Sequence, residues 1–143
     1  MKEQDQLVRK IENDFAIVGL RKDGIVHVYF KPHTEITITL QEILLVIYNE
    51  ITGGVKMPFI FQAGEYCSVS KDARDNTRNI EPLSPTKASV VYVNTLAHKL
   101  IAEFYYKFNK PMQPYKVVSE FSEGIRWLLQ VNNEIDEREK GNS

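Results

Sequence analysis

The side chain with the clearest potential for chemistry is that of the only cysteine, Cys67. It lies three residues before Ser70, which we predict to be the N-cap of a helix. A helix N-terminus or a neighbouring cation lowers the pKa of a thiol and makes it a better nucleophile. Cysteine is also among the residues most often buried as small apolar side chains. Cys67 has no C-x-x-C partner, and we favour the interpretation that it packs in the interior.

The histidines, serines and glycines show no catalytic or metal-binding spacing. His27, His33 and His98 fall in a predicted strand, loop and helix, whereas a metal site needs three or four converging ligands. No serine lies in a G-x-S-x-G elbow. No G-x-G-x-x-G or P-loop motif is present, and the Gly53-Gly54 pair follows a predicted helix instead of opening one. The sequence therefore predicts a non-enzymatic protein with no catalytic residue, no metal site and no cofactor.

One strongly polar helix is predicted over Lys71–Asn79, with Ser70 as its N-cap. Arg74 and Arg78 lie four residues apart and so on one side of this helix. The residues able to line a buried side are few: Ala73, Thr77 and Ile80. One interpretation is a solvated helix that covers a sheet edge. The other is a docking surface for a protein partner, formed by the loop Glu65–Val69, which contains Ser68, and by Ser70, Lys71, Arg74 and Arg78.

Two strands are predicted ahead of the first helix. Phe15–Leu20 and Ile25–Phe30 are rich in β-branched and aromatic residues, and Arg21-Lys22-Asp23-Gly24 separates them. An Asp-Gly pair between two such runs is a strong signal for a β-hairpin. We therefore expect the chain to open with an antiparallel pair.

The first long helix is predicted from its cap and its stop. Thr39-Leu40-Gln41-Glu42 has the S/T-x-x-E/Q form of a capping box. Apolar residues then recur at three- and four-residue steps, which places them on one helical stripe: Leu40, Ile43, Leu44, Ile47, Tyr48 and Ile51. Gly53-Gly54 supplies the left-handed stop.

The rest of the chain alternates between strands and helices. Further strands are predicted at Pro58–Gln62, Ala88–Val93 and Tyr115–Val118, and further helices from Asn94 or Thr95 to Phe108 and after Ser119. Alternation of this kind implies right-handed crossovers and a largely parallel sheet, so the fold class is α/β with a mixed β-sheet. We expect one domain over residues 1–143, with a core at about 15–130 and mobile termini at 1–10 and 132–143.

Composition narrows the function classes. Of 143 residues, 43% are hydrophobic and 26% charged, and 18 basic against 19 acidic residues give a net charge of −1. These values fit a globular domain and argue against a nucleic-acid binder, which usually carries a basic stripe. We expect no membrane span, because no apolar run approaches the roughly 20 residues required. With a polar N-terminus and one cysteine, a cytoplasmic location is expected, and a homodimer is compatible with the chain.

The element order resembles the STAS fold of bacterial anti-anti-sigma factors. Three stretches resemble the SpoIIAA-like proteins, a small bacterial branch of that superfamily: Gly24-Ile25-Val26-His27-Val28-Tyr29-Phe30, Cys67-Ser68-Val69-Ser70-Lys71-Asp72-Ala73-Arg74, and Asn109-Lys110-Pro111 with Trp127-Leu128. The likeness covers about Phe15 to Gln130. It implies a STAS-like sheet with an N-terminal antiparallel hairpin followed by alternating helices and parallel strands.

The resemblance also carries an expectation about regulation. Signalling members of the superfamily resemble one another in an Asp-Ser step at the start of the second helix, where the serine is phosphorylated to disrupt docking onto a kinase-type anti-sigma factor. Here Ser70 falls at the aspartate and Lys71 at the phospho-acceptor. Lysine does not accept that phosphate, so the departure implies that the switch is lost. Ser68 would substitute only if it is exposed.

Two functions from different classes follow as hypotheses. The first is a STAS-like binding or regulatory domain that meets a protein partner through Ser68, Ser70, Lys71, Arg74 and Arg78. The alternative is a carrier of a small apolar or lipid-like ligand, held between the sheet and the aromatic helix Thr95–Phe108. That helix carries a dense group of aromatic residues, Phe104, Tyr105, Tyr106 and Phe108.

Overall fold

The computed structural model describes residues 6–95, 98–99, 102–103 and 110–141. The strands of its main sheet are β1 (Leu7–Glu12), β2 (Ala16–Arg21), β3 (Val26–Phe30), β5 (Met57–Ala63), β7 (Thr86–Tyr92) and β8 (Tyr115–Val118). A small second sheet joins β4 (Glu35–Ile36) to β6 (Ser68–Val69). The described helices are α2 (Ile38–Thr52), α3 (Lys71–Ile80), the 3₁₀ turn η1 (Glu81–Leu83) and α5 (Phe121–Gly141).

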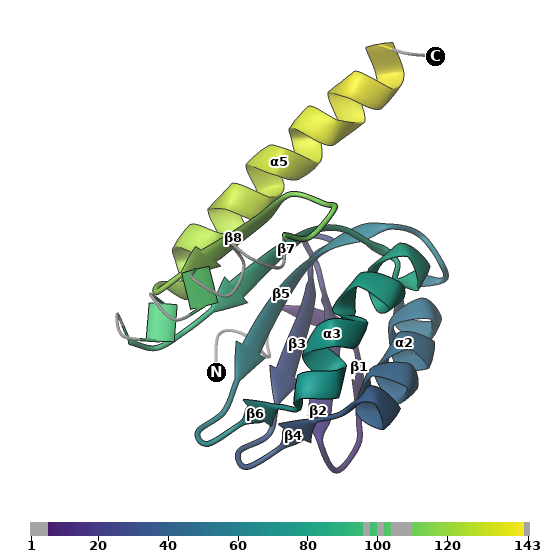
Figure 1. Cartoon of the computed structure of the whole chain (residues 1–143). Helices are drawn as coiled ribbons and strands as arrows, with labels where there is room; N and C mark the ends of the chain where they lie inside the picture. Colours follow the sequence, from purple (N-terminus) through teal and green to yellow (C-terminus); the bar gives the residue numbers. More distant parts are fainter. Residues whose placement is uncertain (1–5, 96–97, 100–101, 104–109, 142–143) are drawn as a thin grey trace.

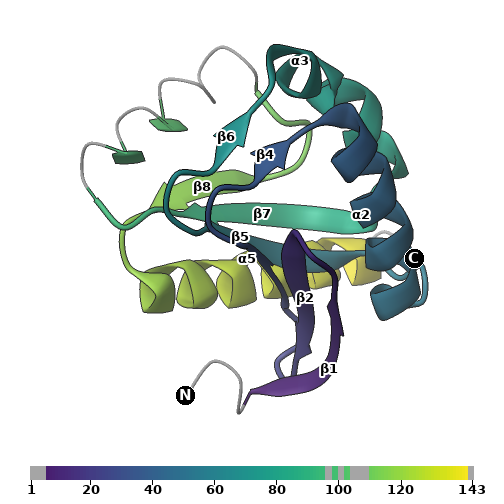
Figure 2. The ribbon, with the colours of Figure 1, turned by 90° about the horizontal axis from the view of Figure 1, so that it is seen from below.

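The main sheet is mixed, as the sequence predicts. Its strand order is β1-β2-β3-β5-β7-β8. β1, β2 and β3 pair antiparallel, and β3, β5, β7 and β8 then pair parallel. Figures 1 and 2 show α2 and α3 on one face of this sheet and α5 on the other. The chain is therefore a three-layer α/β structure.

The predicted hairpin between β2 and β3 is confirmed. Gly24 in its turn has a φ of 82°, a left-handed conformation that favours glycine. The Asp23 carboxylate accepts hydrogen bonds from the Arg21 guanidinium at 2.9 to 3.2 Å and from the Ile25 backbone N–H at 3.2 Å. The turn is thus held by both its glycine and its aspartate.

Alternation along the strands divides the core into two clusters. Val26, Val28 and Phe30 of β3 belong to the cluster under α2. Ile25, just before β3, belongs instead to the cluster under α5 with Ile60. Successive side chains of a strand point to opposite faces of a sheet, so this sheet is apolar on both sides where helices cover it.

The N-cap of α2 differs from the prediction. Helix α2 begins at Ile38, and the hydroxyl of Thr37, not Thr39, accepts a hydrogen bond from the Leu40 backbone N–H at 3.2 Å. The predicted capping box over 39–42 is therefore wrong, because the Thr-Ile-Thr sequence offers two hydroxyls and the β4–β6 pairing ends at Ile36. The predicted stop is confirmed, since Gly53 is the C-cap with a φ of 66°.

The described parts of both terminal segments contain secondary structure that the sequence analysis did not predict. Within residues 1–10, Leu7–Lys10 are part of β1, which pairs with β2 through the backbone. Within residues 132–143, α5 continues to Gly141. Backbone pairing needs no apolar pattern, so the polar composition of these segments did not reveal their structure. The predicted helix over Thr95–Phe108 lies largely outside the described residues; 98–99 and 102–103 are helical.

Candidate functional site

Helix α3 begins where the sequence places it. The Ser70 side chain accepts a hydrogen bond from the Ala73 backbone N–H at 3.1 Å, and the Ser70 carbonyl accepts one from the Arg74 N–H at 3.0 Å. Ser70 has an extended backbone, with φ −65° and ψ 155°, as an N-cap requires. The predicted cap is confirmed, and it fixes the start of the helix that carries the candidate site.

The polar character of α3 has a structural cause. Only Ala73 of this helix is buried. The Gln41 side chain on α2 donates a hydrogen bond to the Ala73 carbonyl at 2.9 Å, and its oxygen accepts one from the Asn76 side chain at 3.0 Å. Helix α3 therefore docks on α2 through amide hydrogen bonds around one alanine, where most amphipathic helices dock through an apolar stripe.

The side of α3 that faces away from α2 carries the predicted cations. Lys71, Arg74 and Arg78 are all exposed. In the residues just before the helix, Ser68 is exposed and the side chains of Tyr66 and Val69 are 77% and 40% exposed. We call this set the α3 surface; its members are Tyr66, Ser68, Val69, Lys71, Arg74 and Arg78. The structure thus places all of the predicted site residues on β6 and α3, with Ser70 half-buried at the junction.

Two loops are joined beside the α3 surface. β4 and β6 pair in parallel, with Glu35 opposite Ser68 and Ile36 opposite Val69. The Ser68 N–H donates to the Thr34 carbonyl at 3.0 Å, and the Cys67 thiol donates to the Lys31 carbonyl at 3.1 Å. Cys67 is half-buried, and its hydrogen bond to Lys31 joins the loop before β6 to the loop before β4.

The tips of the same two loops meet through aromatic stacking. The rings of His33 and Tyr66 stack with centroids 5.1 Å apart and planes 18° apart. Both residues have left-handed backbone conformations, with φ of 66° and 62°, at a cost of about 1 kcal/mol each for non-glycine residues. The His33 N–H also donates to the Glu65 carbonyl at 2.9 Å. Sequence reasoning missed this pair, because glycine or asparagine is the usual signal for such a turn.

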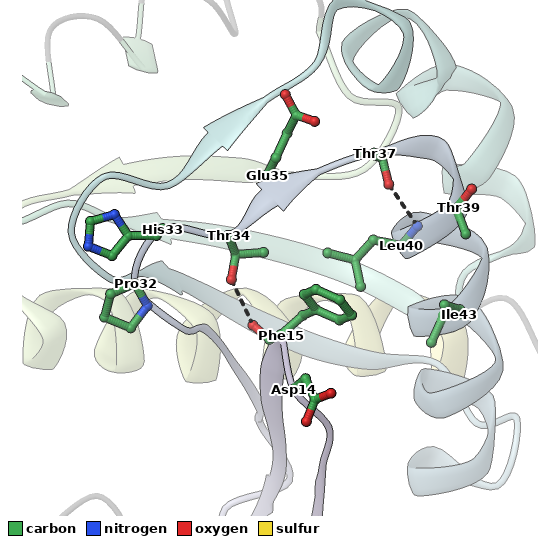
Figure 3. A pocket seen from close by; sticks show the side chains of 10 residues that line it. All are labelled: Asp14, Phe15, Pro32, His33, Thr34, Glu35, Thr37, Thr39, Leu40 and Ile43. Carbon is green, nitrogen blue, oxygen red and sulfur yellow. Dashed lines mark hydrogen bonds between the residues drawn. The ribbon is translucent and has the colours of Figure 1, made fainter.

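A cavity of about 460 Å³ opens on the other side of β4 (Figure 3). Its lining comes from the β1–β2 turn, the loop before β4, and the first turns of α2. The lining residues are Asp14, Phe15, Pro32, His33, Thr34, Glu35, Thr37, Thr39, Leu40 and Ile43. The sequence did not reveal this cavity, because its three segments are brought together only by the fold.

The remaining candidate groups do not form a further site in the described part of the chain. His27 on β3 contacts Gln62 at 2.9 Å and the Phe121 ring at 5.0 Å, and His33 lies in the loop before β4. No group of three or more His, Cys, Asp or Glu side chains there could hold a metal ion. No described helix is long and apolar enough to cross a membrane. The aromatic residues Phe104, Tyr105, Tyr106 and Phe108, proposed from sequence to line an apolar pocket, lie outside the described residues.

Known proteins resemble the chain in sequence pattern and in fold. The model of a family described as "Domain of unknown function (DUF7793)" matches residues 19–132. Among solved structures, the chain is similar to an uncharacterized protein from the DUF3478 family with a SpoIIAA-like fold, from Shewanella loihica PV-4. The identity is 12%, and the similarity covers 82% of this chain and 98% of that chain with a TM-score of 0.57. No curated protein matches. The SpoIIAA-like fold expected from the sequence is thereby confirmed.

Proposed function

The chain belongs to the DUF7793 family, whose description states no function, and from this premise we propose that it is a non-enzymatic STAS-like binding domain that docks a protein partner through the α3 surface. The proposal rests on one observation. The inward side of α3 is held by hydrogen bonds with Gln41 and buries a single alanine. Its exposed residues are mostly charged, three cations and two aspartates, and they follow a segment in which Tyr66 and Val69 are exposed.

The composition of the α3 surface suits protein recognition. Tyrosine and arginine are enriched among the residues that contribute most to interface affinity. Tyr66 is 77% exposed although it is a large aromatic residue, and its ring is held in place by stacking on the His33 ring. Neither Lys71 nor Arg78 forms an ion pair with another described residue. These cations are therefore available to pair with carboxylates of a partner at the edge of an interface.

Regulation by phosphorylation at the start of α3 is not part of the proposal. Lys71 occupies the position that matches the phospho-acceptor of signalling STAS proteins, and a lysine ammonium does not form a phosphate ester. The hydroxyl of Ser70 is already engaged as the helix cap. Of the two serines at the start of α3, Ser68 is exposed on β6. We therefore propose constitutive docking, with Ser68 as the serine to monitor for phosphorylation.

The test is charge reversal on the α3 surface. Arg74→Glu with Arg78→Glu should abolish capture of a specific partner by the tagged full-length chain, because it replaces two cations with two anions at the proposed interface. A matched control is Arg126→Glu with Arg138→Glu on α5, which makes the same change in charge on the opposite face of the sheet. Each pair places one reversal in the last turn of a helix, and the melting temperature of each variant is measured together with the capture to show that it is folded.

The proposal predicts a difference between these two double variants. A partner recovered with wild type and with the α5 variant, but not with the α3 variant, supports docking through the α3 surface. Equal recovery with both variants assigns the interface elsewhere and overturns the proposal. Mass spectrometry of the purified chain, for intact mass and for the Ser68 peptide, checks separately for a retained ligand and for phosphorylation.

A further inference from the structure

The cavity beside α2 is built from three segments that are each held in place by hydrogen bonds. The Asn13 side chain accepts the backbone N–H groups of Phe15 and Ala16 at 2.8 Å, which fixes the turn that carries Phe15. The Phe15 carbonyl accepts the Lys31 N–H at 2.8 Å and the Thr34 hydroxyl at 3.3 Å. The β1–β2 turn and the loop before β4 are thus tied to one another, and the cavity is preformed.

The middle of the cavity is apolar. Figure 3 shows the Phe15 ring beside Leu40, with Ile43 one helical turn farther along α2. Leu40 is buried, but Phe15 and Ile43 are 48% and 42% exposed. Covering these exposed apolar side chains with a ligand is favourable, by about 25 cal/mol for each Å² of apolar surface removed from water. The cavity volume of about 460 Å³ lies in the range typical of small-molecule sites.

One edge of the cavity is acidic. Figure 3 shows the Asp14 carboxylate on the Phe15 side of the cavity, whereas the Glu35 carboxylate points away from Phe15 and Leu40. Neither forms an ion pair with another described residue, and the lining contains no lysine or arginine. The nearest lysine in sequence, Lys31, is engaged by Glu12 at 2.7 Å, and its hydrogen bond lowers the pKa of that carboxyl.

The start of α2 offsets only part of this negative charge. A helix N-terminus acts as about half a positive charge, whereas the Asp14 carboxylate contributes a full negative charge. In addition, the Thr37 hydroxyl and carbonyl already accept the N–H groups of Leu40 and Gln41 at 3.2 and 2.9 Å. The charge of the cavity therefore disfavours an anion at the helix start and favours a cation at the acidic edge.

We propose that this cavity binds an organic cation, in which an ammonium or guanidinium group at the Asp14 carboxylate is attached to an apolar body that covers Phe15, Leu40 and Ile43. The site adjoins the α3 surface, since its lining residue His33 stacks on Tyr66, but it does not depend on the function proposed for that surface. The same chemistry is available from a free small amine or from a basic side chain next to an apolar one in a peptide.

The test compares three probes of one size and different charge. 2-Phenylethylammonium, 2-phenylethanol and phenylacetate are titrated into the full-length ¹⁵N-labelled chain, and amide shifts are followed in Asp14, Phe15 and residues 34–40. The ammonium should give the tightest saturable binding and phenylacetate the weakest. A capped Phe-Arg dipeptide is titrated in parallel; tighter binding than phenylethylammonium at the same amides identifies a peptide source, and weaker binding a free amine.

Matched variants separate the charge effect from a change in fold. Asp14→Asn should weaken phenylethylammonium about threefold, the effect of one solvated carboxylate, and leave phenylethanol unchanged. Asp75→Asn removes the same charge outside the lining and should change neither probe. Phenylacetate binding as tightly as the ammonium, equal ammonium affinity in the Asp14→Asn and Asp75→Asn variants, or no saturable shift at these amides overturns the proposal.

Discussion

Gly124 lies where α5 approaches the sheet most closely, and its replacement by alanine sets two known effects against each other. An alanine Cβ at this position would lie 2.8 Å from Cγ1 of Val90, 3.2 Å from Cδ1 of Ile60 and 3.2 Å from Cγ2 of Val118. These side chains come from β7, β5 and β8 and are fully buried. Because β5 and β8 both pair with β7 and the three side chains are fully buried, their methyl groups have little room to move away.

The magnitudes favour destabilisation. Alanine in place of glycine inside a helix gains about 1 kcal/mol of intrinsic propensity. Carbon atoms attract one another at about 3.5 to 4.0 Å and repel at the separations found here, and overpacking a well-filled core costs about 1 to 3 kcal/mol. With one contact at 2.8 Å and two more at 3.2 Å, we expect the upper part of that range. Gly124→Ala should therefore lower the free energy of unfolding by about 1 to 2 kcal/mol.

Urea unfolding followed by circular dichroism measures this difference. The midpoint should fall by about 0.5 to 1 M with an unchanged slope. Gly141→Ala is the matched control, because it lies at the end of the same helix and its Cβ would meet nothing within 4 Å; its midpoint should stay the same or rise slightly.

A double-mutant cycle then identifies the contact responsible. Val90→Ala alone opens a cavity and is destabilising, by about 0.5 to 3 kcal/mol. In the Val90→Ala background, Gly124→Ala should cost less than in wild type or become stabilising, because the nearest clashing methyl is gone. If Gly124→Ala is as stable as wild type, or if its cost is the same in both backgrounds, the close approach of α5 does not limit the residue at position 124 and the reasoning is refuted.

Two further predictions concern the α3 cap and a buried phenol. Ser70→Ala should lower the free energy of unfolding by about 1 kcal/mol and speed hydrogen exchange at the Ala73 amide. Ser70→Asp should preserve the protection of that amide, because aspartate is also a good N-cap. Equal exchange in wild type and both variants would contradict the role of Ser70 as the cap. Burial raises the pKa of Tyr48 above its ordinary value of 10.0, so the folded state favours the neutral phenol. The contribution of the neutral phenol to the free energy of unfolding is complete below pH 10. Above pH 10 it is lost by about 1.4 kcal/mol per pH unit. Urea unfolding should therefore show that the free energy of unfolding falls less between pH 8 and pH 11 in Tyr48→Phe than in wild type. Equal falls in the two proteins would contradict burial as the cause of the raised pKa.

Local signals in the sequence were enough for much of the fold. The Asp23-Gly24 turn between β2 and β3, the Gly53 stop of α2 and the Ser70 cap of α3 were all predicted from residues within a few positions of one another. Each is a case in which backbone conformation depends on a single side chain, or on its absence in glycine. The apolar runs of β5 and β7 were found for a similar reason, since burial on both faces leaves a continuous hydrophobic stretch.

Where two local choices were equal, tertiary pairing decided. Thr37 and Thr39 are both acceptable N-caps for α2, and the pairing of β4 with β6 up to Ile36 selects Thr37. β1 has no apolar alternation strong enough to predict a strand, yet its backbone pairs with β2 over most of its length. Backbone hydrogen bonds are common to every residue except proline, so a partner strand can recruit a polar segment that composition alone describes as loose.

The candidate sites also depend partly on local sequence and partly on tertiary structure. The sequence by itself determined that the five predicted site residues follow one another along a loop and a polar helix, because neighbours in sequence stay neighbours in space: Ser68, Ser70, Lys71, Arg74 and Arg78. Only the tertiary structure determined which side of α3 is outward, since the Gln41 amide that holds its inner side lies about 30 residues away on α2. It also formed the cavity, which brings Phe15 of the β1–β2 turn next to Leu40 and Ile43 of α2. Contacts between distant segments depend on packing, and no local pattern of residue types records them.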